Sequence, residues 1–141
     1  MPTTYWQRTN LDANRLDPAF DEGEANELPV NLGPSETYAR GEVLAESVDT
    51  PGTFLKRDPA ATLTGPATHI LRYACVTDAD GNITYGGAGS VNEFPDTRLD
   101  TNAYISGIFK CEDVSGLDAD ALTELGGRIL YGDLTAGIFR F

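Results

Sequence analysis

The sequence predicts a mainly β fold, a small β-barrel or compact sandwich with one short helix, preceded by an extended N-terminal arm. Throughout residues 41–141, short apolar segments alternate with turns rich in Gly, Pro, Asp and Asn. Only one stretch in that region has helical periodicity. A chain of 141 residues is long enough for one hydrophobic core and short for two domains, so we expect residues 41–141 to form a single β-rich domain.

Residues 1–40 are predicted to form the arm. They contain Pro2, Pro18, Pro29 and Pro34 and show no sustained strand or helix period. Apolar side chains nevertheless recur along the segment, which indicates an extended chain that becomes ordered on the surface of a partner. A tail that wraps around its own domain is the alternative interpretation. The candidate partner-binding side chains are Tyr5, Trp6, Leu11, Leu16 and Phe20.

The first half of the domain is expected to contain two hairpins. Residues 41–48 and 52–58 flank the turn Asp49-Thr50-Pro51-Gly52, which favours a hairpin. Residues 68–77, THILRYACVT, are expected as one long strand. This strand ends at the Gly-containing turn 78–82, after which residues 83–85 return as a short partner.

The second half begins with the clearest strand prediction, residues 103–111. Its buried face is predicted to carry Ala103, Ile105, Gly107, Phe109 and Cys111, and its exposed face Tyr104, Ser106, Lys110 and Glu112. Residues 117–125 predict the helix, with an apolar stripe on one side and Gly126-Gly127 as the C-terminal stop. Two short strands around Gly132-Asp133 are expected to close the chain.

Composition argues against several partner classes. Asp and Glu outnumber Lys and Arg by 22 to 10, and the resulting net charge of −12 would repel a phosphate backbone, so nucleic acid is not an expected partner. No apolar run reaches the roughly 20 residues of a membrane span, and the first residues lack a signal-peptide pattern. We therefore expect no membrane partner and no secretion. Cys75 and Cys111 are expected to be free, buried thiols rather than zinc ligands or a disulfide.

Nothing in the sequence points to catalysis, so we expect a non-enzymatic protein without a cofactor. His69 is the single histidine and has no metal-ligand partner at a suitable spacing. The glycine-rich residues 86–90 lack the lysine and following helix of a phosphate-binding loop. Residues 78–82 resemble the start of a calcium loop but lack its later ligands, and a hairpin turn explains them better. No metal site is expected.

The order of elements after residue 41 resembles the head-decoration protein family of tailed bacteriophages, typified by phage lambda. The resemblance rests on the strand Gly41-Glu42-Val43-Leu44, on residues 52–61 with their Asp-Pro-Ala-Ala ending, and on residues 103–109 followed by a helix, a glycine and an Ile-rich final strand. It implies a homotrimer made in the host cytoplasm and seated on the outer surface of the expanded capsid of the virion. It also implies that N-terminal segments pair with strands of the major capsid protein.

Two other functions stay open at this point. A small β-barrel that binds a sugar or another small ligand would use the aromatic residues Tyr85, Phe94 and Tyr104, which flank the 86–102 loop, as a stacking platform. Core and interface packing is the simpler explanation of the same residues. Another virion accessory protein is the second alternative.

Overall fold

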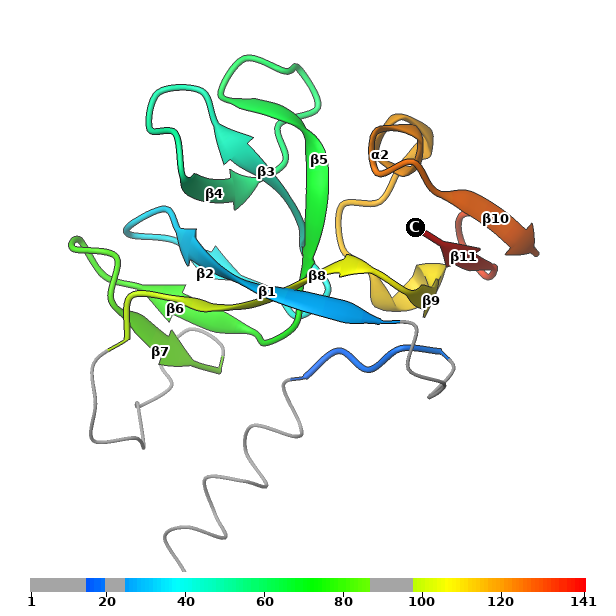
Figure 1. The fold of residues 1–141 in the computed structure, drawn as a ribbon, viewed down its shortest axis with the longest axis horizontal. Coiled ribbons are helices and arrows are strands. Elements are labelled where there is room, and N and C mark those ends of the chain that lie inside the picture. Colours follow the sequence, from blue (N-terminus) through cyan, green and yellow to red (C-terminus); the bar gives the residue numbers. More distant parts are fainter. Residues whose placement is uncertain (1–14, 20–24, 87–97) are drawn as a thin grey trace, which may run out of the picture.

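The structure is a computed structural model that describes residues 15–19, 25–86 and 98–141. Five strands close into a barrel in the order β1-β4-β3-β5-β8 (Figure 1). The barrel strands are β1 (Asn26–Leu32), β3 (Val43–Ser47), β4 (Thr53–Lys56), β5 (Thr64–Leu71) and β8 (Thr101–Ser106). The predicted fold class, mainly β with a small barrel, is confirmed.

Two three-stranded sheets lie on opposite sides of the barrel (Figure 1). One has the order β2-β6-β7 and the other the order β10-β11-β9. The first contains β2 (Thr37–Tyr38), β6 (Cys75–Thr77) and β7 (Ile83–Tyr85). The second contains β9 (Ile108–Lys110), β10 (Arg128–Tyr131) and β11 (Ile138–Arg140). A 3-10 turn, η1 (Cys111–Asp113), and the helix α2 (Ala119–Glu124) connect β9 to β10.

The locally encoded elements match the prediction. β3 and β4 form the expected antiparallel hairpin, with Ala45 opposite Leu55. The 78–82 turn is held by the Asp78 carboxylate, which accepts the backbone N–H groups of Asp80 and Asn82, each at 2.9 Å. β6 and β7 pair across that turn. The helix and the two closing strands are also present, and α2 is followed by Gly126 at φ +74°.

The sequence predicted two long strands, and in the structure each of them is interrupted. Residues 68–77 divide into the end of β5 and the separate strand β6, and residues 103–111 divide at Gly107. Gly107 has φ +150°, and a Cβ atom there would lie 2.6 Å from the ring of Phe109. At both breaks the chain leaves the barrel and enters one of the small sheets, so the alternation of buried and exposed side chains does not continue from one strand into the next. Within β8, before the break at Gly107, Tyr104 is buried because it packs in the core with Leu16, and Ile105 is exposed, the reverse of the prediction.

The predicted arm boundary at residue 40 was also wrong. β1 pairs antiparallel with β8 over Asn26–Val30 and parallel with β4 at Asn31 and Leu32, so residues 26–32 belong to the barrel. Pro29 argued against a strand because it lacks an N–H. At that position β1 pairs only with β8, so the strand tolerates a residue that cannot donate to a second neighbour. Leu28, Val30 and Leu32 alternate along β1, and Val30 and Leu32 are buried in the core while Leu28 is exposed.

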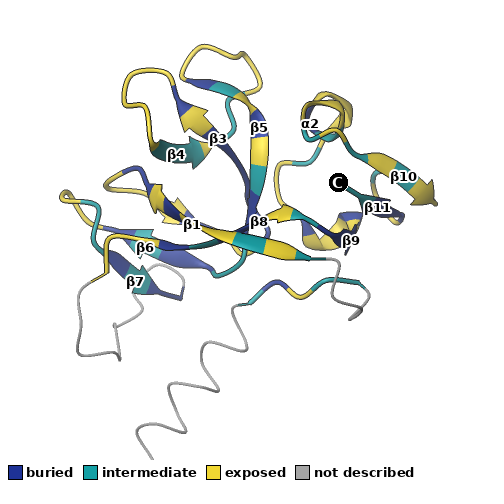
Figure 2. Cartoon of the chain, viewed as in Figure 1, coloured by how far each residue is buried: buried dark blue, intermediate teal, exposed yellow. Residues whose placement is uncertain are grey.

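Buried apolar side chains form two clusters, and the exposed residues lie on loops, on turns and on the outward-facing parts of strands such as β1 and β10 (Figure 2). The first cluster, between the barrel, β9, β11 and α2, comprises Leu16, Val43, Ala67, Ile70, Tyr104, Phe109, Cys111, Val114, Ala121 and Phe139. The second, toward β2, β6 and β7, comprises Val30, Leu32, Tyr38, Leu44, Leu71, Cys75, Ile83, Tyr85 and Ala103. Cys75 and Cys111 lie in different clusters, and both thiols are buried and unbridged, as predicted.

Candidate interaction surface

Residues 15–19, which we call the strap, lie against the outside of the barrel. The Leu16 N–H donates to the carbonyl of Arg72, and the Ala19 N–H donates to the carbonyl of Ile108, each at 2.7 Å. The Tyr104 hydroxyl donates to the Leu16 carbonyl at 2.9 Å. These bonds attach the strap both to the chain after β5 and to β9, so its path across the barrel is fixed.

Leu16 is a correction to the predicted partner-binding set. Its side chain is 2% exposed and packs in the first core cluster with Tyr104 and Phe109, so it is not available to another protein. For the strap, the alternative of a tail that wraps around its own domain is the correct one. The other members of the set, Tyr5, Trp6, Leu11 and Phe20, lie outside the residues that the structure describes.

The aromatic residues proposed as a ligand platform do not form one where they are described. Tyr85 is buried, and its hydroxyl lies 3.2 Å from the Thr101 hydroxyl. Tyr104 is buried beneath the strap. Phe94 lies outside the described ranges. Core packing therefore explains the two tyrosines that the structure describes.

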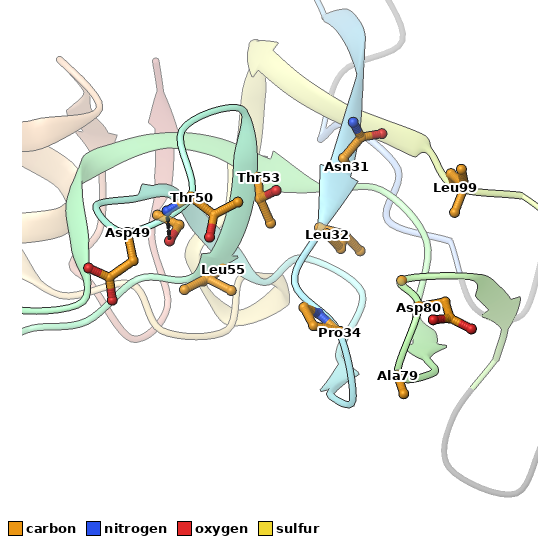
Figure 3. A pocket seen from close by; sticks show the side chains of 12 residues that line it. Asn31, Leu32, Pro34, Asp49, Thr50, Thr53, Leu55, Ala79, Asp80 and Leu99 are labelled. Carbon is orange, nitrogen blue, oxygen red and sulfur yellow. Dashed lines mark hydrogen bonds between the residues drawn. The ribbon is translucent and has the colours of Figure 1, made fainter.

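A groove of about 560 Å³ lies between the end of β1, the β3–β4 turn and the β6–β7 turn. Leu32, Pro34 and Leu55 lie between two acidic side chains, Asp49 on one turn and Asp80 on the other (Figure 3). The volume is in the range of small-ligand pockets, and apolar lining with a few polar groups is typical of binding sites. The groove can therefore hold apolar side chains next to a cation.

The two acidic residues of the groove are held on ordered turns. The Thr50 N–H donates to the Ser47 hydroxyl at 3.1 Å, and the Gly52 N–H donates to the Glu46 carboxylate at 3.0 Å, which fixes the turn next to Asp49. Neither Asp49 nor Asp80 forms an ion pair within the described part of the chain. Sequence reasoning identified both turns, but their meeting across the barrel end depends on β1, which it missed.

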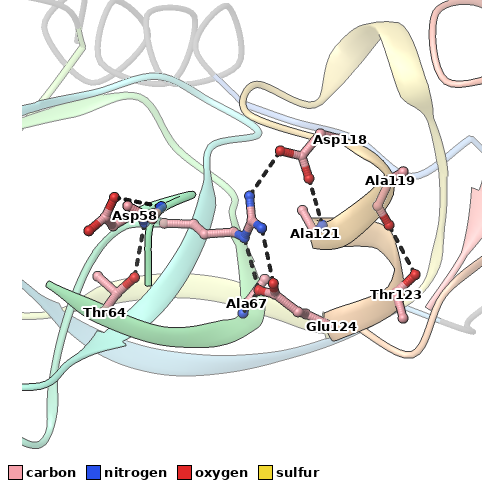
Figure 4. Close-up of polar contacts among 10 residues, drawn as sticks. Asp58, Thr64, Ala67, Asp118, Ala119, Ala121, Thr123 and Glu124 are labelled. Carbon is pink, nitrogen blue, oxygen red and sulfur yellow. Dashed lines mark hydrogen bonds and ion pairs between the residues drawn. The ribbon is translucent and has the colours of Figure 1, made fainter. Parts of the chain in front are cut away.

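The most extensive ion-pair cluster serves as a clamp between α2 and the barrel (Figure 4). The Arg57 side chain is 5% exposed and donates to both oxygens of Glu124, at 2.9 and 3.0 Å, and to Asp118 at 3.1 Å. Asp118 also caps the helix by accepting the Ala121 N–H at 2.7 Å, while Glu124 accepts the Ala67 N–H of β5 at 2.8 Å. A helix this short has little stability alone, so the clamp supports it.

Hydrogen bonds to Arg57 lower the pKa of the Glu124 carboxyl, whereas burial raises the pKa of Glu42 next to β3. The His69 ring packs edge-on against Phe54, with the ring centroids 4.6 Å apart, and burial lowers the pKa of His69.

Within the described ranges, no group of three or more His, Cys, Asp or Glu side chains could hold a metal ion. No described helix has the length and apolar character needed to cross a membrane.

No protein-family model, curated protein or solved structure matches the chain. Its function must therefore be inferred from its own residues.

We expect Leu16→Ala to destabilise the folded chain by about 2–5 kcal/mol, because it removes buried contacts and leaves a cavity in the first core cluster. Urea unfolding followed by circular dichroism measures this. Leu63→Ala is the matched control, since Leu63 is 58% exposed and its truncation should change stability by no more than about 0.5 kcal/mol. Equal effects of the two substitutions would show that the strap is not part of the core.

Two glutamates should respond to pH with opposite signs. Glu124→Gln should cost about 1–3 kcal/mol at neutral pH, because it weakens the partner of the buried Arg57. The lowered pKa of Glu124 means that its contribution is present above the unfolded value of 4.5 and is lost as pH falls through the folded pKa. Burial raises the pKa of Glu42, so its charged form destabilises the fold at neutral pH. Glu42→Gln removes that charge and should therefore increase stability at neutral pH. The gain should disappear as the pH falls to 4.5, where Glu42 is protonated in the folded chain.

Urea unfolding of both variants between acidic and neutral pH tests these signs, with the exposed Glu112→Gln as the control. A Glu124→Gln difference that persists unchanged into acid would contradict the clamp. A Glu42→Gln variant that is less stable at neutral pH would contradict the cost assigned to its buried charge.

Proposed function

We propose that this chain is a non-enzymatic decoration protein that binds the outer surface of an expanded bacteriophage head as a homotrimer and stabilises it. Its order of elements from β3 onward supports this: a hairpin, a late strand, a capped helix, a glycine and a final Ile-containing strand. The same order carries the resemblance to the head-decoration family. The major capsid protein is the proposed partner, and the outside of the virion the proposed location.

The observation that carries the proposal is the anchored strap. Leu16 is buried and the strap is hydrogen-bonded at both ends, so the chain before Arg15 begins from a fixed point on the barrel. That preceding segment contains Tyr5, Trp6 and Leu11 in its sequence. An extended segment with spaced apolar side chains suits strand addition to another protein, and a fixed base lowers the entropy cost of placing it.

The charges and the loops support a scaffold on the outside of the head. A chain with net charge −12 would be repelled by packaged DNA, which favours the outer surface over the interior. Several carboxylates are engaged in holding loops: Asp58 accepts the N–H groups of Ala60, Thr62 and Leu63, and Asp133 accepts that of Thr135. These contacts keep the exposed loops rigid, as a surface-binding module requires.

Reinforcement of the shell follows from linkage. A protein that binds only the expanded lattice stabilises that lattice by RT ln(1 + [L]/Kd) at each site, and the contributions of many sites add. Three arms on one trimer would raise the effective affinity further, because one bound arm keeps the other two close to their sites.

Deleting residues 2–14 should leave the barrel folded and sharply weaken binding to the head, because the deletion removes Tyr5, Trp6 and Leu11 but keeps the strap. Trp6→Ala alone should weaken binding roughly tenfold to a hundredfold, since burying a large apolar side chain contributes about 1.5–3 kcal/mol. Co-sedimentation with expanded heads stripped of decoration, alongside circular dichroism, measures both effects.

Gln7→Ala is the neighbouring control and should bind like the unmodified chain. If the folded deletion variant binds the heads as tightly as the full chain, the arm is not the capsid contact. If the full chain itself does not bind expanded heads, the proposed function is wrong.

A further inference from the structure

The β10–β11 end of the molecule exposes large side chains on an edge strand, β10. β10 pairs with β11 and with no other strand of the described chain. Leu130 is 39% exposed and Tyr131 61% exposed, and Arg128 at the start of the strand is also exposed. We call Arg128, Leu130 and Tyr131 the tip. Exposed large apolar side chains beside a cation are typical of a contact surface.

The tip is better suited to side-chain docking than to strand addition. The register between β10 and β11 shifts between Ile129 and Tyr131, which is the pattern of a β-bulge. A bulge on an edge strand interrupts the row of backbone groups that an added strand would need. A pocket therefore suits the tip better than another strand edge does.

A tightly closed turn follows the tip. Gly132 comes directly after Tyr131 at φ +84°, and a Cβ atom there would lie 2.5 Å from the Cα atom of Gly137, so the two glycines let the hairpin ends approach closely. The Gly137 N–H donates to the Asp133 carbonyl at 2.7 Å and closes the turn. A preformed hairpin loses little conformational entropy when it binds.

The groove complements the tip in chemistry. It has an apolar lining that includes Leu32 and Leu55, and it carries Asp49 and Asp80. Arg128 forms no ion pair in the part of the chain that the structure describes, and neither does Asp49 nor Asp80. Leucine and tyrosine side chains would fill the apolar part, and the guanidinium would pair with a carboxylate at the border of the groove.

One molecule cannot make this contact with itself. The β3–β4 and β6–β7 turns that border the groove lie at one end of the long axis of the molecule, and β10 lies at the other (Figure 1). We propose that the tip of one copy docks in the groove of a second copy. Such a head-to-tail contact uses two different surfaces on each molecule and closes into a ring when the rotation between copies permits it.

This inference goes beyond capsid attachment, because it assigns the surfaces through which copies of the chain meet. It does not depend on binding to a phage head, since the contact involves only this chain. The proposed function can fail in the capsid experiment while the tip–groove contact is present in solution, and the reverse also holds.

Analytical ultracentrifugation of the full chain across the micromolar range tests the contact. The unmodified chain should form one discrete oligomer. Arg128→Glu, and separately Asp49→Arg with Asp80→Arg, should each weaken association roughly tenfold or more by placing like charges together. Combining all three substitutions in one chain should restore association, because the charges are then exchanged between tip and groove.

Two controls separate the contact from general effects of charge and hydrophobicity. Glu112→Arg with Asp120→Arg changes the net charge as much as the groove variant does, but outside the groove, and should not weaken association. Tyr131→Ser should weaken association, whereas Leu63→Ser, another exposed apolar position, should not. Circular dichroism verifies that each variant is folded.

Several results would overturn the inference. A chain that stays monomeric throughout the concentration range has no such contact. A folded triple variant that fails to regain association would show that tip and groove do not meet. An oligomer that is lost with Tyr131→Ser but survives the groove variant would assign β10 to a contact with a surface other than the groove.

Discussion

The fold depends on the closure of the barrel by β1. This strand joins β8 on one side and β4 on the other, and its parallel pairing with β4 consists of only two residue pairs, Asn31 with Thr53 and Leu32 with Phe54. Gly33 extends this seam by donating its N–H to the Phe54 carbonyl at 2.9 Å. A Cβ atom at Gly33 would lie 2.1 Å from a methyl group of Leu55, so a side chain there would have to displace the Leu55 side chain that packs over the seam. Without the seam, β4 and β1 would both become open edges.

Closure also determines where the binding surfaces lie. The end of β1 carries Leu32 to the β3–β4 and β6–β7 turns, which together form the groove. The opposite end of the molecule carries the second small sheet and its exposed strand β10 (Figure 1). The strap crosses the barrel between the chain after β5 and β9 and fixes the point from which the N-terminal segment begins. The proposed capsid arm and the proposed contact between copies do not compete for the same residues, because the strap, the tip and the groove consist of different parts of the chain.

The sequence predicted those elements whose causes are local. Asp78 and the Pro51-Gly52 pair encode their turns, and Asp118 encodes the start of α2, through contacts with neighbouring residues. It did not predict β1, because Pro29 lacks an N–H and so indicates a break in a strand. In the structure β1 has only one neighbouring strand at Pro29, so the missing N–H costs no hydrogen bond to a second strand. Whether Leu16 faces a partner or its own core depends on Tyr104, 88 residues away in sequence. The groove could not be predicted either, since its two acidic turns come together only in the closed barrel.

The folded unit begins with the strap and β1 rather than at residue 41. Native-state hydrogen exchange tests this most directly, because hydrogen-bonded amides of a folded unit exchange only when that unit opens. We expect the amides of Leu16 and Ala19, and those of β1 that pair with β8, to be protected to a degree similar to the amides of β8. Exchange of residues 15–19 and 26–32 at the rate of an unstructured peptide, with β8 still protected, would show that the strap and β1 lie outside the folded unit.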